Sequence, residues 1–129
     1  MSRLLLVAAA ACGILAAGPA VQAQGMEPAR TADTAKGKTL VDMKGMTLYV
    51  FDRDAAGKSN CNGACATNWP PLMASGSDKP MGAWTIVTRD DGGKQWAYRE
   101  KPLYTWVKDS KVGDVTGDGV NSVWHVAQP

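Results

Sequence analysis

The fold is decided by the stretch Tyr49-Val50-Phe51-Asp52-Arg53-Asp54, which returns later in the chain as Tyr104-Thr105-Trp106-Val107-Lys108-Asp109. Both stretches follow the formula Tyr-x-aromatic-x-x-Asp, and each follows a lead-in that ends in leucine, Leu48 in one case and Leu103 in the other. A pattern that recurs within one chain indicates that one structural unit has been used twice. The sequence therefore predicts a domain made of two related repeats.

The sequence around each motif predicts β structure. Each repeat contains a strand, a turn, the Tyr-x-aromatic strand, an irregular polar loop and a tryptophan near its end. The first repeat covers about residues 39–73 and the second about 95–127. Short strands separated by Gly, Pro and Asp clusters, without a long amphipathic helix, are typical of all-β domains. We therefore expect a small antiparallel β domain with at most one short helical turn, around the cysteine pair at 61–65.

Four further stretches carry a family resemblance: residues 45–49, 61–66, 69–72 and 101–104. With the two motifs, they make the chain resemble the bacterial secreted-repeat proteins, many of which are labelled predicted lipoproteins with a Tyr-x-(Phe/Trp/Tyr)-x-x-Asp motif. That family has no established biochemical role. The resemblance therefore implies architecture and export, and it implies no activity.

The first 23 residues have the pattern of a secretory signal peptide. Arg3 supplies a positive charge, residues 4–17 are almost wholly apolar, and small residues at 21–23 offer a cleavage site. We expect an exported protein, either periplasmic or secreted. Lipid anchoring through Cys12 is the less favoured alternative, because the apolar segment before that cysteine would be short.

The chain beyond residue 23 has the length of a single domain. Residues 24–38 are polar and alanine-rich without periodicity, which predicts a flexible leader ahead of a β domain over residues 39–129. The formal net charge of +2 is too small to suggest binding to nucleic acid. No later segment is apolar enough to suggest a membrane span. We expect the partner to be an envelope component or a small ligand, and we expect no cofactor.

Cys61 and Cys65 are the cysteines that remain after signal cleavage. In an oxidising compartment such a pair most simply forms a disulfide, and Gly63 lets the short loop bend. The alternative is a copper site, because a Cys-x-x-x-Cys pair can hold Cu(I), with His125 as a third ligand. That alternative would make the protein a periplasmic copper or redox protein and requires free thiolates.

The repeated motif has a structural interpretation and a functional one. Rings two residues apart on a strand share a face, so we expect the four motif rings to build a core. A carboxylate at the end of each strand would accept backbone N–H bonds and fix the following loop. The structural set is Tyr49, Phe51, Asp54, Tyr104, Trp106 and Asp109. Alternatively, aromatic side chains that include Trp69 and Trp124 form a surface that binds a glycan, a peptide or an envelope component.

Signatures of enzymes are largely missing from the sequence. It contains no Gly-x-Ser-x-Gly, no His-Glu-x-x-His and no phosphate-binding loop. His125 could act as a base with Asp109 or Asp118 as its orienting partner, but no spacing fixes that geometry. We expect a non-catalytic binding or envelope-associated protein, with an enzyme of unknown type as a further alternative.

Overall fold

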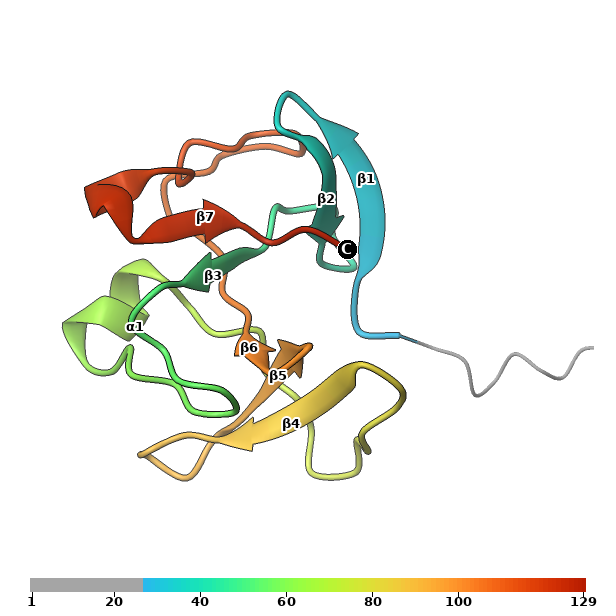
Figure 1. Ribbon diagram of the computed structural model, residues 1–129, viewed down its shortest axis with the longest axis vertical. Coiled ribbons are helices and arrows are strands. Elements are labelled where there is room, and N and C mark those ends of the chain that lie inside the picture. The colour runs from blue at the N-terminus through green and yellow to red at the C-terminus, as the bar shows by residue number, and fades with distance from the viewer. Residues whose placement is uncertain (1–26) are drawn as a thin grey trace, which may run out of the picture.

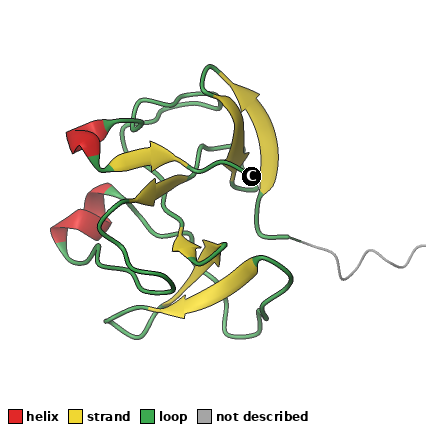
Figure 2. Cartoon of the chain, in the orientation of Figure 1, coloured by secondary structure: helices red, strands yellow, loops and turns green. Residues whose placement is uncertain are grey.

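The computed structural model describes residues 27–129 (Figure 1). The predicted signal peptide, Cys12 and the first three residues of the predicted leader lie outside the described residues. Short strands dominate the chain, as the sequence predicts, and helix is confined to two brief segments (Figure 2). In chain order the elements are β1 (Arg30–Thr34), β2 (Gly37–Val41), β3 (Tyr49–Phe51), α1 (Ala64–Asn68), β4 (Trp84–Thr88), β5 (Lys94–Tyr98), β6 (Lys101–Pro102), the 3-10 turn η2 (Val120–Ser122) and β7 (Trp124–Val126).

The predicted flexible leader is wrong for residues 30–38, which form β1 and the first part of β2. The turn between these strands is formed by residues 35 and 36, and Gly37, the first residue of β2, leaves it at φ +88°. The hairpin is tied by a hydrogen bond of 3.0 Å between the hydroxyls of Thr34 and Thr39. Because β1 is an edge strand with largely exposed side chains, its sequence lacks the alternation that marks a half-buried strand.

A shift of 55 positions, from Tyr49 to Tyr104, relates the two halves of the chain. It carries the β1–β2 hairpin onto the antiparallel β4–β5 hairpin. At the centre, the Tyr49 N–H donates to the Tyr104 carbonyl at 2.8 Å, and the Tyr104 N–H donates back to the Tyr49 carbonyl at 3.0 Å. This reciprocal pair places an approximate two-fold axis between the two tyrosines.

The C-terminal segment of each repeat pairs with the other repeat. Strand β3 of the first repeat runs antiparallel to β7 of the second, and the Ala127 N–H donates to the Leu48 carbonyl at 2.8 Å. The symmetric counterpart is the bond from the Leu72 N–H to the Leu103 carbonyl, at 2.9 Å. Figure 1 shows β7 lying along β3, although the two strands come from different repeats and are far apart in the sequence. The motif strand of each repeat therefore forms backbone hydrogen bonds with the C-terminal segment of the other repeat.

Two groups of buried side chains form the core. One lies between the hairpins and contains Ala29, Leu40, Leu48, Trp84, Trp96, Leu103 and Ala127. The other lies around the two-fold axis and contains Tyr49, Cys61, Trp69, Tyr104, Trp124 and Val126. Within residues 27–129, no helix has the length and apolar character that crossing a membrane requires.

Gly117 offers a test of the packing around the axis. A Cβ built on this residue would lie 2.9 Å from atoms of both Tyr49 and Trp69. Because neither buried ring can move freely, we expect Gly117→Ala to lower the free energy of unfolding by about 1–3 kcal/mol, the usual cost of overpacking. Urea denaturation followed by tryptophan fluorescence would measure it. Gly76→Ala is the matched control, because a Cβ there meets nothing within 4 Å; equal stability of the two variants would contradict the prediction.

Candidate functional site

The repeated motif forms two crossed hydrogen bonds between the halves. The Tyr49 hydroxyl donates to Asp109 Oδ2 at 2.6 Å, and the Tyr104 hydroxyl donates to Asp54 Oδ2 at 2.7 Å. Both tyrosine side chains are fully buried. The tyrosine of each motif is therefore bound by the aspartate of the other motif, and not by its own.

The second oxygen of each aspartate holds the loop that follows its own strand. Asp54 Oδ1 accepts the backbone N–H of Asn60 at 2.7 Å. Asp109 Oδ1 accepts the backbone N–H of Thr116 at 3.0 Å and the hydroxyl of the same residue at 2.6 Å. Each carboxylate thus fixes a local loop and a distant tyrosine at the same time.

Burial sets the protonation of this cluster. It raises the pKa of the Tyr49 phenol well above its usual range, and the neighbouring Asp109 carboxylate raises it further. Burial likewise raises the pKa of Tyr104, with a further contribution from Asp54. The same cause raises the pKa of Asp54, although the N–H of Asn60 and the Tyr104 hydroxyl oppose the shift. The phenols therefore remain neutral donors over the whole neutral range.

Four aromatic rings stack in a continuous column across the two-fold axis. Neighbouring ring centroids are 4.2 Å apart for Phe51 and Trp124, 3.8 Å for Trp124 and Trp69, and 3.9 Å for Trp69 and Trp106. Trp69 is only 4% exposed and Trp124 only 2%, because each covers one face of the other. Trp69 and Trp124 therefore do not present open ring faces to solvent, and only their edges can reach it.

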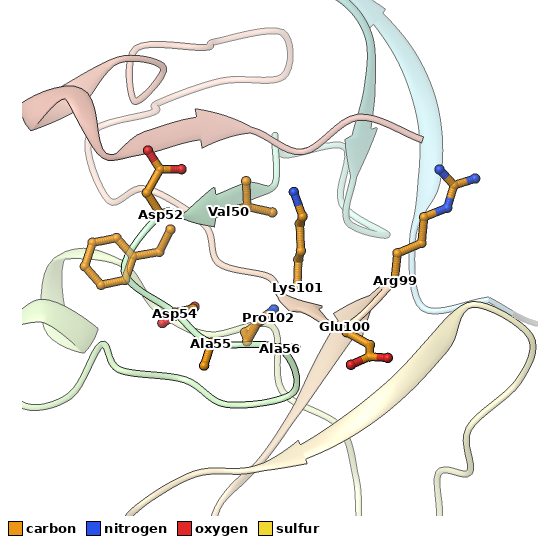
Figure 3. Close-up of a pocket in the computed structure, with 10 residues that line it drawn as sticks. Val50, Asp52, Asp54, Ala55, Ala56, Arg99, Glu100, Lys101 and Pro102 are labelled. Carbon is orange, nitrogen blue, oxygen red and sulfur yellow. The ribbon is translucent and has the colours of Figure 1, made fainter.

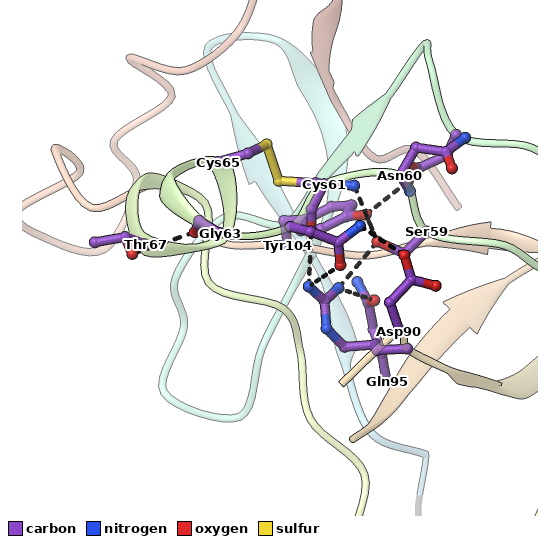
Figure 4. Close-up of a disulfide and its surroundings, with 12 residues drawn as sticks. Ser59, Asn60, Cys61, Gly63, Cys65, Thr67, Asp90, Gln95 and Tyr104 are labelled. Carbon is purple, nitrogen blue, oxygen red and sulfur yellow. Dashed lines mark hydrogen bonds between the residues drawn. A yellow bond between two sulfur atoms is a disulfide. The ribbon is translucent and has the colours of Figure 1, made fainter. Parts of the chain in front are cut away.

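Cys61 and Cys65 form the expected disulfide, at the start of α1 (Figure 4). Cys61 is fully buried, and Cys65 is partly exposed. Because both sulfurs are joined, they cannot act together as thiolate ligands. The alternative copper site at Cys61, Cys65 and His125 is thus contradicted, and His125 instead pairs with Asp52.

A buried arginine next to the disulfide was not predicted from the sequence. Arg89 is 5% exposed and donates to the Cys61 carbonyl at 2.6 Å, to Ser59 Oγ at 2.9 Å and to Gln95 Oε1 at 2.8 Å (Figure 4). Ser59 Oγ in turn lies 2.6 Å from the Tyr104 hydroxyl. Since that phenol gives its proton to an aspartate, Ser59 is the donor in this pair. Two hydroxyls therefore connect the buried cation to the Asp54 carboxylate.

His125 lies on the outer side of the paired strands β3 and β7. Its Nε2 is 2.8 Å from Asp52 Oδ2, and both side chains are about half exposed. The partner is therefore Asp52, and not Asp109 or Asp118. Asp109 binds Tyr49, and Asp118 accepts the N–H of Val126 at 3.0 Å. The sequence offered no signal for this pairing, because cross-strand neighbours depend on the β3–β7 register.

Two adjoining cavities of about 310 and 410 Å³ share four lining residues: Val50, Asp52, Arg99 and Lys101 (Figure 3). We call them together the Val50 groove. Its further lining residues are Phe51, Asp54, Ala55, Ala56, Tyr98, Glu100, Pro102, Leu103 and residues 125–129. The volumes lie in the lower range of known small-molecule sites, about 300–1,000 Å³.

One wall of the Val50 groove is a strained turn between β5 and β6. Arg99 and Glu100 have φ values of +51° and +70°, in the left-handed region that favours glycine. Two-residue hairpin turns of this kind usually contain Asn-Gly or a similar pair, and a non-glycine residue there costs about 1–2 kcal/mol. The corresponding turn of the first repeat contains a glycine, Gly45, at φ +89°. Strain that the chain avoids in one half but retains in the other points to a use for these side chains.

The Val50 groove is specific to one half of the domain. The 55-residue shift replaces Val50 by Thr105, Asp52 by Val107, Lys101 by Met46 and His125 by Pro70. These counterparts remove the carboxylate of Asp52, the ammonium group of Lys101 and the imidazole of His125, whereas Arg99 keeps a cationic counterpart in Lys44. In the other half Val112 also covers the equivalent turn, since its Cγ2 lies 3.0 Å from a Cβ built on Gly45.

The crossed bonds are tested by removing one hydroxyl. Tyr49→Phe takes a donor from the buried Asp109 and an acceptor from the Gly117 N–H, which lies 3.2 Å away. We expect a loss of about 1–3 kcal/mol in the free energy of unfolding, the cost of leaving a buried polar group unsatisfied. Chemical denaturation gives the value. Tyr98→Phe is the control, because the hydroxyl of this half-buried residue makes no hydrogen bond within residues 27–129. A similar loss of unfolding free energy in both variants would contradict the prediction.

Alkaline titration tests the raised pKa values of Tyr49 and Tyr104. Both exceed the usual value of 10.0, so the stability that these phenols contribute is complete below pH 10.0 and is lost as the pH rises toward the folded-state pKa values. We expect their ionisation, measured by absorbance near 295 nm, to appear only together with unfolding seen by circular dichroism. Ionisation of all three tyrosines of the chain before any loss of structure would contradict this.

Comparison with known proteins agrees with the internal symmetry. Residues 30–73 and 85–128 each match the profile of a family described as a secreted repeat of unknown function. Both matches begin earlier than the repeats expected from the sequence, because each includes the outer strand of its hairpin, β1 or β4. No curated protein matches the chain, and no solved structure does. The two matched segments cover more than half of the chain, and the protein therefore belongs to this family of secreted repeats.

Proposed function

We propose that this protein is a non-catalytic binding domain of the cell envelope or its surroundings, and that its ligand is an amphipathic anion held in the Val50 groove. One observation carries the proposal. The buried motif is the same in both halves, whereas the charged groove with its strained turn is present in one half only. Structural needs explain the shared residues, and they do not explain a strained, charged wall on one side.

The chemistry of the groove supports an anionic ligand with an apolar part. Val50, Pro102 and Leu103 supply apolar surface, and Lys101 extends toward Val50 (Figure 3). Glu100 points the opposite way in the same view. Arg99 and Lys101 form no ion pair with any residue in 27–129, and the Arg99 guanidinium lies over the Tyr98 ring, 5.0 Å from its centroid. Neither positive charge is therefore neutralised by a carboxylate of the described residues.

The environment of His125 supports binding and not catalysis. Its Nε2 is already paired with the Asp52 carboxylate. Among the residues that the structure describes, no serine, threonine or cysteine side chain hydrogen-bonds to this histidine, so a nucleophile and base pair is not assembled. In this proposal the contact with His125 holds the Asp52 side chain in place at the groove wall. Membership of a secreted family suits a ligand that is met outside the cytoplasm.

A fluorescent amphipathic anion, 8-anilinonaphthalene-1-sulfonate, tests the groove. We expect saturable binding to the native protein and competition by dodecanoate. Lys101→Met, which copies the counterpart residue Met46, should weaken binding about tenfold, because a hydrogen bond to a charged group contributes about 1.5–3 kcal/mol. Fluorescence titration at constant salt gives the dissociation constants.

Lys44→Met is the matched control for that experiment. Lys44 is the counterpart of Arg99 in the other half, so this variant makes the same charge change away from the groove. We expect its affinity to equal that of the unchanged protein. If Lys44→Met and Lys101→Met lost the same affinity for the probe, net charge alone would explain the loss and the proposal would be overturned. Binding of the probe only to unfolded protein would overturn it as well.

A further inference from the structure

A separate depression of about 340 Å³ lies at the edge of the aromatic column. We call it the aromatic depression. Its apolar lining comes from Phe51, Trp69, Trp124, Val123 and Cys65, and its polar lining comes from Arg53, Asn68 and Asn121. It shares Phe51 with the Val50 groove, but none of the residues that carry the proposal for that groove line it.

The polar groups of the aromatic depression are chiefly donors without partners. The side chains of Arg53, Asn68 and Asn121 make no hydrogen bond or ion pair with any other residue in 27–129. The same holds, over that range, for the indole N–H groups of Trp69 and Trp124, although buried indoles usually find an acceptor. No aspartate or glutamate lines the depression. The site therefore has one positive charge and an excess of donors, which suits a ligand rich in acceptors and negatively charged.

Backbone strain positions one of these donors. Asn121 and Ser122 are adjacent non-glycine residues with φ values of +52° and +61°. Their counterparts under the 55-residue shift, Ala66 and Thr67, lie within helix α1. Where the first repeat has a helical turn, the second repeat thus has a backbone conformation that costs free energy, and this conformation places Asn121 at the rim of the depression.

We infer that the aromatic depression binds a hexuronate residue of an acidic saccharide. The planar guanidinium of Arg53 matches a carboxylate in geometry and charge. Amide groups such as those of Asn68 and Asn121 donate to and accept from hydroxyl groups, which a saccharide supplies on neighbouring carbons. Phe51 and the indole edges offer apolar surface to the C–H face of the ring. The inference is independent of the ligand proposed for the Val50 groove.

Titration of the exported protein with trigalacturonate tests this site, with galactotriose as the neutral comparison. The stacked tryptophans provide the fluorescence signal, and calorimetry gives the affinity. We expect the acidic trisaccharide to bind at least about tenfold more tightly than the neutral one. Arg53→Gln should remove that preference. Lys108→Gln should keep it, because Lys108 is the counterpart of Arg53 in the other half.

Asn121→Gly is a second variant that can still test the site if Arg53→Gln folds poorly. Glycine tolerates the left-handed backbone, so this variant should fold at least as stably while its affinity for trigalacturonate falls severalfold. Affinity for 8-anilinonaphthalene-1-sulfonate should stay unchanged in Arg53→Gln, which separates this site from the Val50 groove. Equal binding of both trisaccharides, unchanged affinity in Arg53→Gln, or equally tight binding of acetate would each overturn the inference.

Discussion

The crossed hydrogen bonds from Tyr49 to Asp109 and from Tyr104 to Asp54 constrain the rest of the structure. Each bond requires a tyrosine of one repeat to lie beside the strand end of the other, and this brings the two motif strands together across the axis. Trp69 and Trp124 can then stack face to face. Because each carboxylate also holds a loop, the same two bonds determine where the surface loops begin.

Structural features formed by residues close together in the sequence were largely predictable. The repeat, the β class and the Cys61–Cys65 disulfide follow from motif spacing, turn residues and compartment. The role expected for the aspartates covered only the bonds to their own loops. Their tyrosine partners lie 50 and 60 positions away, and no local pattern encodes a contact at that distance. Strand β1 was missed because an edge strand exposed along most of its length shows no hydrophobic period.

The candidate sites depended even more on tertiary structure. Arg89 follows a strand and looks like an ordinary surface residue, yet its partners at 59 and 61 bury it. Arg99 and Glu100 occupy a turn for which Asn-Gly would be the usual signal. Tryptophans suggested a ligand surface because large rings are common in such sites, but stacking buried them. The sequence does not reveal how the strands of one half are aligned with the strands of the other. That alignment determines which side chains contact one another.

The exchange of C-terminal strands has a consequence for how such a protein could diversify. Two separate copies of one repeat could form the same contacts as a symmetric homodimer, in which any substitution necessarily occurs on both sides. Joining the copies through residues 74–84 removes that obligation. A charged residue or a strained turn can then be acquired by one half alone, while the other half retains the glycine and the apolar side chains that maintain stability. In a chain that contains both repeats, the surface residues of each half can therefore change independently of those of the other half.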